Sequence, residues 1–430
     1  MNRRCRVGLT LVLSVGLMIS SAAVFASGAQ EAAKPAEVVE IEWLFDENPQ
    51  DLNLDKLIAT FEAANPNLKI KPLYTPSRYV EKMHTLIAAG TPPDLMRHND
   101  DYVQDYAVRD LLLPLDDYIK KAKIKTEGFV PAFWDWPKVG GKHMSWVKGL
   151  TAEVVWINVN AFKEAGVALP PKDRWTWDDF LATAKKMTVG SGAETKRWGG
   201  AISHTFPSHE VTWSANNGGT VYSEDGRRFV LAEPKGAEAV QWVADLALVH
   251  HVQPPYSMWG QMNQTDLFAA GSLAMFNGDS RQIPSVTRKV AGKFVWAARP
   301  IPGKVNYKTG GALDSHAIPK QAKHPAEAFK WLLFLTSEEA YKIMGQSGFW
   351  LPVKPAWATP YWLPGVALPE DRDIAVKALD GYLPVPKTTN TERARQVYWP
   401  QIRLVMNGDI KAEAALNAVK KEVEALLAEF

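Results

Sequence analysis

The ordered part of the chain opens with alternating strand-like and helix-like hydrophobic patterns. Val38–Phe45 is a strand-like run, and residues 54–61 carry apolar side chains at helical spacing. The two patterns then repeat as a strand over 68–74, a helix over 78–89 and a short strand over 94–96. This alternation predicts a mainly parallel β-sheet flanked by helices.

A second strand–helix unit begins near Thr151. Val154–Ile157 reads as a strand, and Thr176 with Asp179 three residues later predicts a capped helix start. Further predicted elements are helices over 161–165, 236–250, 326–335 and 338–344, a buried strand over 271–276 and a final helix with an apolar stripe from Leu416 to Phe430. The chain is therefore predicted to hold two α/β units.

Polar residues follow two of the predicted strands directly. Asp46, Glu47 and Asn48 follow the first strand, and His98–Asp101 follows the strand at 94–96. Ligands of such sheets collect at the carboxyl ends of the strands. We therefore expect both loops at the rim of a binding site.

The N-terminus has the order of a secretory signal peptide. Arg3, Arg4 and Arg6 precede an apolar run from Val7 to Ala23, and small residues occupy the cleavage positions around Ala26. We predict a signal peptide over 1–26, a flexible leader over 27–37 and a periplasmic or secreted location. An uncleaved membrane anchor is the alternative reading. Cys5 lies before the apolar core, where no lipid-attachment cysteine is expected, so the mature chain has no disulfide.

The charge balance excludes a nucleic-acid partner. The chain carries 49 Lys+Arg and 47 Asp+Glu, a net charge of +2, and removal of the three signal-peptide arginines lowers this to −1. A nearly neutral chain without runs of like charge has no electrostatic footprint for nucleic acid. The chain is rich in tryptophan, with 17 residues. This abundance is relevant to function, because aromatic rings stack on the C–H faces of sugars.

Seven short motifs, in order, resemble one known family. They are Phe61–Pro66, Ala89–Asp94, Asn158–Phe162 with Trp175–Asp178, Phe268–Met275, Gly310–Gly311 before Ile318–Pro319, Ala328–Leu332 and Gly348–Pro352. With these motifs the chain resembles the extracellular solute-binding proteins of carbohydrate ABC importers, the group that includes maltose-binding protein.

The resemblance implies a two-lobed α/β fold that closes over a ligand. Lobe one is expected over 38–149 and 311–346, and lobe two over 150–310 and 347–430. Three chain crossings are expected between the lobes, near 148–151, 309–312 and 347–352. The implied protein is a monomer that captures a sugar in the cleft and delivers it to the transmembrane subunits of a permease, with no cofactor and no metal.

Candidate ligand residues combine tryptophan with acids and amides, because sugars offer both C–H faces and hydroxyls. We read Trp213–Gly218 as a loop of this kind and place Asn277–Asp279 in a turn; Lys148 lies at the first crossing and Gly311 at the second. The predicted ligand-binding residues are Asp46, Glu47, Asn99, Asp100, Lys148, Trp213, Asn216, Asn277, Asp279, Gly311 and Trp350. Most other tryptophans are expected in the core, and Trp357, Trp362 and Trp399 in surface packing. Asp100 and Asp101 have an alternative role as caps of the next helix.

Enzyme signatures are absent from the sequence. It contains no Gly-x-Ser-x-Gly elbow, Walker loop, dinucleotide fingerprint or His-Glu-x-x-His motif. His204 with His209–Glu210, and the pair His250–His251, are poor metal chelates.

Two alternatives stay open. A secreted glycoside hydrolase would need two carboxylates across a scissile bond, for which Asp46 or Glu47 could face Asp279. The same fold could instead bind a polyamine, metal chelate or phosphodiester, and Arg281 with Lys148 would suit an anionic sugar such as a uronate.

Overall fold

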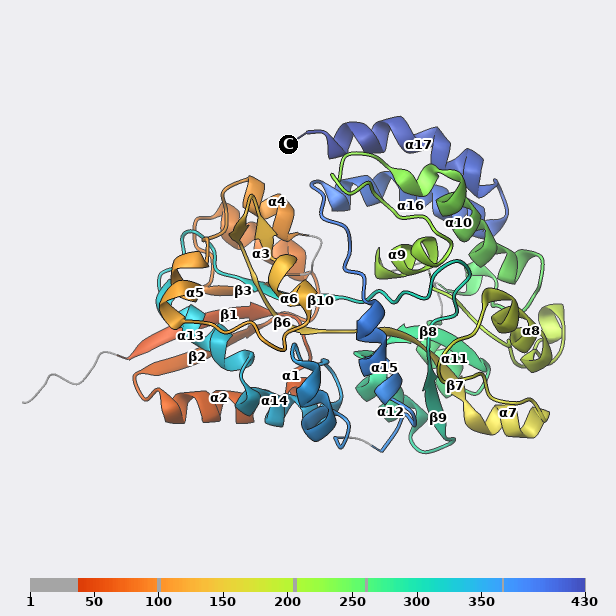
Figure 1. Ribbon diagram of the computed structural model, residues 1–430, viewed down its shortest axis with the longest axis horizontal. Helices are drawn as coiled ribbons and strands as arrows, with labels where there is room; N and C mark the ends of the chain where they lie inside the picture. The colour runs from red at the N-terminus through yellow and green to blue at the C-terminus, as the bar shows by residue number, and fades with distance from the viewer. Residues whose placement is uncertain (1–37, 99–101, 204–206, 260–261, 366, 430) are drawn as a thin grey trace, which may run out of the picture. The chain divides into compact units, whose positions relative to one another are not determined.

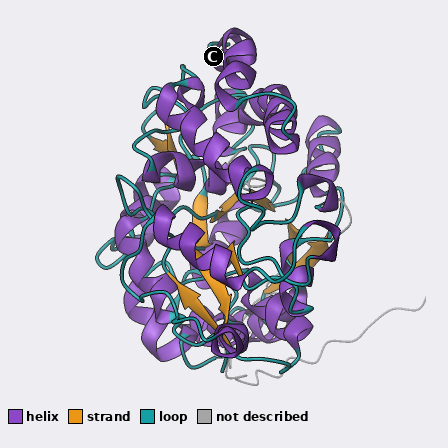
Figure 2. Ribbon diagram, turned by 90° about the vertical axis from the view of Figure 1, so that its right-hand side faces the viewer, coloured by secondary structure: helices purple, strands orange, loops and turns teal. Residues whose placement is uncertain are grey.

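The computed structural model describes residues 38–98, 102–203, 207–259, 262–365 and 367–429. The segment Val38–Phe430 forms one compact unit, and the predicted signal peptide and leader lie outside the described residues. Within this unit the two larger β-sheets stand apart, each with helices beside it (Figure 1). Figure 2 shows the same arrangement from the side, with strands inside and helices outside.

The first sheet has the strand order β2-β1-β3-β10-β6. Its strands are β1 (Val39–Phe45), β2 (Leu68–Tyr74), β3 (Leu95–His98), β6 (Trp146–Leu150) and β10 (Leu313–Ala317). β1 pairs in parallel with β2 and β3, and β10 pairs antiparallel with β3 and β6. Four strands therefore share one direction, as predicted, and β10 opposes them.

The second sheet has the order β8-β7-β9, with β7 (Glu153–Asn158), β8 (Met275–Asp279) and β9 (Trp296–Arg299). Both pairings of β7 are antiparallel, so the prediction of mainly parallel pairing is wrong for this sheet. The reason is that β7 enters from the first sheet. β10 enters the first sheet from the second in the same way, and each entering strand opposes its neighbours.

The helices divide along the chain between the two sheets. Beside the first sheet lie α1 (Pro49–Leu52), α2 (Leu54–Ala64), α3 (Tyr79–Ala88), α4 (Val103–Val108), α5 (Asp116–Ala122), α6 (Pro131–Asp135), α13 (Pro325–Leu335) and α14 (Glu338–Met344), with the hairpin β4 (Lys138–Val139) and β5 (Lys142–His143). Beside the second lie α7 (Val159–Ala165), α8 (Trp177–Met187), α9 (Pro207–Asn216), α10 (Pro234–Leu248), α11 (Gln264–Ala269), α12 (Gln282–Val290), α15 (Asp373–Lys377), α16 (Thr391–Asn407) and α17 (Ala412–Leu427).

β7 is buried on both faces. Val154 and Trp156 join one hydrophobic cluster, and Val155 and Ile157 join another. Because successive side chains of a strand point to opposite faces, a continuous apolar run of this kind suits a strand covered on both sides. The strand that the sequence predicted at 154–157 is thus confirmed, one residue longer at each end.

Backbone hydrogen bonds join the segments where the chain passes between the sheets. The Thr151 N–H donates to Ala312 O at 3.0 Å, and the Glu153 N–H donates to Gly310 O at 3.0 Å. Leu150 and Leu351 exchange N–H···O bonds of 3.2 and 2.9 Å. The three segments that the resemblance implied as crossings are therefore hydrogen-bonded neighbours, while the crossings and the lobe boundaries themselves stay a prediction.

Of four further predictions about local structure, one is confirmed and three are wrong. The Thr176–Asp179 capping box is confirmed, with both reciprocal bonds present. Trp213 lies in α9, so the reading of Trp213–Gly218 as a loop is wrong for its first four residues. Asn277–Asp279 forms the end of β8 rather than a turn, and Trp362 is fully buried rather than at the surface. In the three corrected cases, packing against distant parts of the chain decided what the local pattern left ambiguous.

Candidate ligand-binding site between the two sheets

Five charged residues converge at the end of β1 and form what we call the first cluster: Asp46, Glu47, Arg97, Lys148 and Asp314. Lys148 Nζ lies 2.8 Å from Glu47 Oε1 and 2.6 Å from Asp314 Oδ2. Arg97 Nε lies 2.8 Å from Asp314 Oδ1, and its Nη1 lies 2.6 Å from Asp46 Oδ1. The sequence predicted three members; the structure adds Arg97 and Asp314.

Strand pairing explains how this cluster assembles. β3, β10 and β6 are neighbours, and Arg97 and Asp314 lie on them. The pairing of β10 with β6 shifts register between Asp314 and Ser315, so that Lys148 has no partner opposite it. A bulge of this kind re-aims a side chain. Here it directs Lys148 to the two carboxylates.

The cluster is buried, and its opposite charges stabilise one another. Lys148 and Asp314 are fully buried, and Arg97 and Glu47 are each 5% exposed. Burial by itself lowers the pKa of Lys148, but Asp314 and Glu47 outweigh burial and raise it. The pKa of Arg97 is raised in the same way, with Asp314, Asp46 and Glu47 outweighing burial. Both cations therefore stay charged.

Trp350 lies against this cluster. Its Nε1 donates to Glu47 Oε1 at 2.5 Å, and Gly149 is so close that a Cβ there would come within 2.9 Å of Trp350 Cβ. Lys148 Nζ and Arg97 Cζ lie 5.5 and 5.8 Å from the ring centroid, within cation–π range. The predicted site residues Asp46, Glu47, Lys148 and Trp350 are thus brought together.

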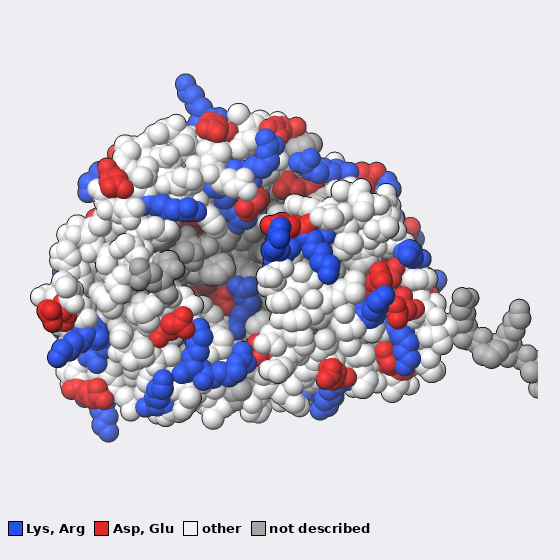
Figure 3. Space-filling model, turned by 180° about the vertical axis from the view of Figure 1, so that it is seen from behind, with Lys and Arg blue, Asp and Glu red and all other residues white. Residues whose placement is uncertain are grey.

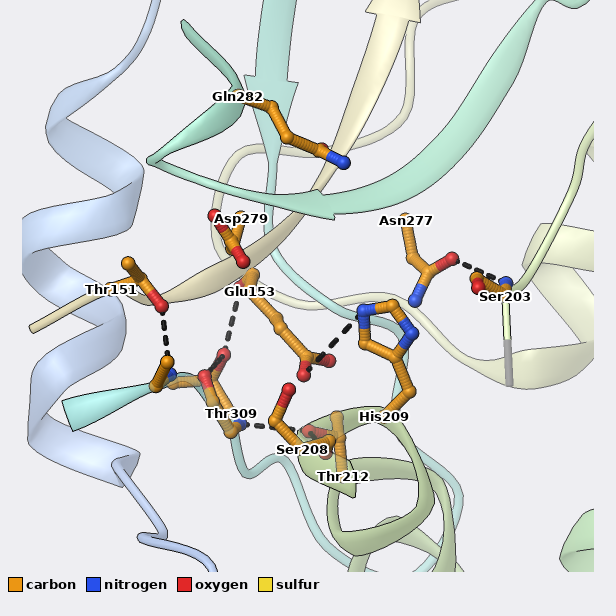
Figure 4. Close-up of polar contacts among 12 residues, drawn as sticks. Thr151, Glu153, Ser203, Ser208, His209, Thr212, Asn277, Asp279, Gln282 and Thr309 are labelled. Carbon is orange, nitrogen blue, oxygen red and sulfur yellow. Dashed lines mark hydrogen bonds and ion pairs between the residues drawn. The ribbon is translucent and has the colours of Figure 1, made fainter. Parts of the chain in front are cut away.

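A second polar cluster comes from β7, β8, α9 and the start of α12: Glu153, His209, Thr212, Asp279 and Arg281. Figure 4 shows its first four members. Glu153 and Asp279 are register partners on β7 and β8. Arg281 Nη2 lies 2.9 Å from Asp279 Oδ2, and His209 Nε2 lies 3.9 Å from Glu153 Oε1. Thr212 Oγ1 accepts a bond of 2.8 Å from the Gly310 N–H. This cluster places the predicted residue Asp279 beside Arg281, which the sequence suggested only for an anionic sugar, and near Glu153 and Thr212, which the sequence reasoning missed.

Glu153 is the unusual member of the second cluster. It is fully buried, and burial raises its pKa to about 8, with the nearby Ser208 and Thr212 hydroxyls acting in the opposite direction. Neither carboxyl oxygen has a well-formed hydrogen bond within the described part of the chain. Near neutral pH Glu153 therefore holds a proton and carries no charge.

Arg281 connects the two clusters. While its guanidinium pairs with Asp279, its Cζ also lies 5.6 Å from the centroid of the Trp350 ring. Trp350 therefore has cations of both clusters around it. Figure 3 shows a hollow in the face seen from behind, with acidic and basic side chains on its walls.

Two more predicted residues lie near the second cluster or a crossing. Asn277 Oδ1 accepts from the Ser203 N–H at 2.7 Å, and its Nδ2 has no partner among the described residues (Figure 4). Gly311 lies in the crossing next to β10, where a Cβ would come within 1.9 Å of Thr151 O. Glycine is required there for close approach of the two chain segments.

The remaining predicted residues lie elsewhere. The ring of Trp213 packs at 5.9 and 5.5 Å from those of Trp177 and Trp242 in a hydrophobic cluster. The Asn216 side chain bonds both the N–H and the C=O of Lys308, at 2.7 and 3.0 Å. The structure does not bring these two residues into either cluster. Asn99 and Asp100 lie outside the described residues.

The missed residues had a usable signal. Glu153 and Asp314 are ionisable residues within or beside apolar strand runs, and Arg97 directly precedes the polar loop 98–101. A charge in a buried strand is costly unless it is paired, so it marks a specific partner. The partner itself cannot be read from the sequence.

One metal-like grouping exists among the described residues. Ligand atoms of Glu47, Asp314 and His316 lie within 4.8 Å of one another, and all three side chains are buried. Lys148 Nζ bridges the two carboxylates, and its positive charge neutralises the group. The donors therefore serve an internal ion pair rather than a cation site.

Two sheets with flanking helices, chain crossings between them and a polar cluster on each side define a two-lobed solute-binding fold. The chain matches the family model of bacterial extracellular solute-binding proteins over residues 46–342. It therefore belongs to the bacterial extracellular solute-binding proteins.

Individual relatives agree with this assignment. A putative binding protein of Brucella abortus is 25% identical over 307 residues, 68% of this chain and 70% of that protein. A multiple sugar-binding protein of Streptococcus mutans is 25% identical over 350 residues, 78% of this chain and 77% of that protein. The solved structure of an ABC substrate-binding protein of Listeria monocytogenes with cycloalternan has a TM-score of 0.82 at 24% identity, covering 90% of this chain and 99% of that one.

A membrane-spanning helix is not found in the part of the chain that the structure describes: none of its helices combines the necessary length and apolar character.

Proposed function

We propose that this protein binds a sugar or oligosaccharide between its lobes and delivers it to the transmembrane subunits of an ABC importer. The observation that carries the proposal is the convergence of the two polar clusters on Trp350, because Arg97 and Lys148 on one side and Arg281 on the other lie within 6 Å of its ring. Acids, amides and hydroxyls beside an aromatic ring suit a polyhydroxyl ligand.

The relatives support the same ligand class. One is named a multiple sugar-binding protein, and solved structures of similar fold hold cycloalternan, maltose or maltotriose. Membership of a solute-binding family favours capture of an intact ligand over its conversion. A hydrolase would need carboxyls free to act on a substrate, whereas Glu47 and Asp279 are held by Lys148, Trp350 and Arg281.

Closure and location complete the proposal. Lobe one would comprise 38–149 and 311–346 and lobe two 150–310 and 347–430, rotating about the three crossings. The protein would act as a monomer in the periplasm or outside the cell after removal of residues 1–26. Its leader would span 27–37.

Isothermal titration calorimetry of the purified protein against neutral mono- and oligosaccharides tests the function, with spermidine and glycerophosphocholine as controls. We expect saturable binding of one sugar class and chromatographic recovery of the sugar intact. Consumption of the sugar would establish the hydrolase instead, and binding only to a control would remove sugars as the ligand.

A variant pair locates the site. Asp46→Asn should weaken sugar binding at least tenfold, because a hydrogen bond to a charged group contributes about 1.5–3 kcal/mol and about 1.4 kcal/mol corresponds to tenfold in affinity. Asp117→Asn, on the exposed side of α5, is the matched control and should bind as the wild type does. Equal affinities of the two variants would exclude Asp46 from the site.

A further inference from the structure

The cations of the two clusters are already occupied by carboxylates. Lys148 contacts Glu47 and Asp314, and Arg281 contacts Asp279 at 2.9 Å and also receives Asp279 Oδ1 at its backbone N–H at 2.8 Å. A sugar acid needs a cation whose charge is available to its own carboxylate. Lys148 and Arg281 were the residues that made such a ligand plausible from the sequence.

Arg97 is committed in the same manner. Its guanidinium lies 2.6 Å from Asp46 and 2.8 Å from Asp314, and Glu47 Oε2 lies 3.7 Å from its Nε. Turning this side chain toward a ligand would leave Asp314, which is fully buried, with one cation fewer. Removing one partner of a buried pair is strongly unfavourable, because it leaves an uncompensated buried charge.

Counted without His209, the charges of the two clusters leave an excess of negative charge. Asp46, Glu47, Asp279 and Asp314 are four carboxylates, and three cations, Arg97, Lys148 and Arg281, face them. Glu153 holds a proton near neutral pH and so offers a donor without adding a charge. A site with one more carboxylate than cations repels an anionic ligand, and its carboxylates are already paired, so it does not require a cationic ligand.

We propose that the site accepts uncharged sugars and rejects sugar acids such as uronates. This inference rests on the proposed function and specifies its substrate class. The discrimination comes from the internal pairing of Lys148, Arg97 and Arg281, so it should change when a pairing carboxylate is neutralised.

Calorimetry on the full protein tests the discrimination with matched ligands at pH 7. The neutral sugar that binds most tightly is compared with its C6-oxidised uronate, and glucose, galactose and galactotriose are compared with glucuronate, galacturonate and trigalacturonate. We expect each uronate to bind at least tenfold more weakly than its neutral counterpart. A uronate that binds as tightly as the neutral sugar, or more tightly, overturns the inference while leaving sugar binding in place; absence of binding by every sugar of both kinds overturns the proposed function itself.

Asp279→Asn tests the cause. The substitution releases Arg281 from its carboxylate, so the ratio of uronate to neutral affinity should rise at least tenfold. Asp373→Asn is the matched control, because Asp373 pairs with Lys377 at 2.7 Å on α15, outside both clusters, and its ratio should stay that of the wild type. An unchanged ratio in a folded Asp279→Asn protein rejects the pairing mechanism.

A second variant guards against misfolding of the first. Asp46→Asn releases part of the Arg97 guanidinium, and the Asp46 side chain is 31% exposed, so the fold should tolerate the change. It should shift the ratio in the same direction. Wild-type ratios in both variants would contradict the inference.

Discussion

Trp350 Nε1 donates a hydrogen bond of 2.5 Å to Glu47 Oε1, although 303 residues separate them in the sequence. The bond ties the segment 347–352, which is predicted as the third crossing, to the loop that follows β1. Both side chains are buried, at 1% and 5% exposure, and Lys148 contacts the same carboxylate oxygen. One carboxylate thus connects a strand end, a bulge and a crossing segment.

Replacing Trp350 by Phe should keep most of the ring packing and remove only the donor. We expect a loss of about 1.5–3 kcal/mol in the free energy of unfolding, the range for hydrogen bonds to charged groups. Urea unfolding measures it. Trp357→Phe is the control, since that partly exposed ring packs against Tyr341 and should cost less. Equal losses would show that the Glu47 bond adds nothing.

Replacing Lys148 by Met should be strongly destabilising. Glu47 and Asp314 would lose the ammonium that lies between them, and breaking a buried pair on one side costs about 3–5 kcal/mol. The matched surface change is Lys320→Met, which removes an exposed pair with Asp110 and should cost less than about 1 kcal/mol. Chemical denaturation of both variants measures the difference, and similar midpoints would disprove this prediction.

Replacing Gly311 by Ala should strain the crossing. The added Cβ would lie 1.9 Å from Thr151 O, so the two hydrogen-bonded segments must separate, at a cost near the top of the overpacking range, about 3 kcal/mol. Gly141→Ala is the control. The φ of Gly141, +79°, disfavours alanine, but a Cβ added there would have no atom within 4 Å. Its cost should be about 1–2 kcal/mol. Thermal unfolding in which Gly311→Ala is the milder change would contradict the close approach.

Glu153 should make stability depend on pH. Burial raises its pKa from 4.5 to about 8, so between these values the folded protein holds a proton that the unfolded chain has released. The stabilisation is complete below about pH 4.5 and is lost as the pH rises through about 8. Glu153→Gln stays neutral and should lack this component of the decline.

Melting temperatures at pH 5, 7 and 9 measure the effect of Glu153→Gln. Glu194→Gln, an exposed control, should follow the wild-type profile. A parallel decline in Glu153→Gln and the wild type would show that Glu153 is not the titrating group.

Lys387 belongs to the predicted lobe two and contacts residues of the predicted lobe one, so it should favour the closed arrangement of the lobes. Its Nζ donates to Asp135 O at 2.7 Å and to Lys138 O at 3.1 Å, at the carboxyl end of α6, where a cation is favourable. Nearby, Trp136 Nε1 donates to Val385 O at 3.1 Å. Lys387→Met should therefore raise the free energy of the closed arrangement relative to the open one by about 1–2 kcal/mol, which lowers the closed population and speeds ligand release.

Small-angle scattering of the ligand-free protein and stopped-flow dissociation measure the effect of Lys387→Met. Lys323→Met, on an exposed surface, is the control. Unchanged dissociation in Lys387→Met would mean that closure does not depend on this contact.

The sequence by itself determined the elements whose causes are local. The apolar run of β7, the Thr176–Asp179 cap and the strand–helix order of the first sheet are confirmed, because each depends on side chains within a few residues of one another. It also indicated Asp46, Glu47, Lys148 and Trp350, since polar residues at strand ends and crossings are visible in the chain.

The tertiary structure decided what these residues contact. The ion pairs of Lys148 span 101 residues to Glu47 and 166 to Asp314, and no local pattern encodes such distances. Trp213 and Asn216 have the composition of a sugar-binding loop, yet α9 directs one into the core and the other to Lys308. The physical reason is burial: a buried charge must find an opposite charge and a buried ring must find apolar neighbours, and only the folded chain determines which are within reach.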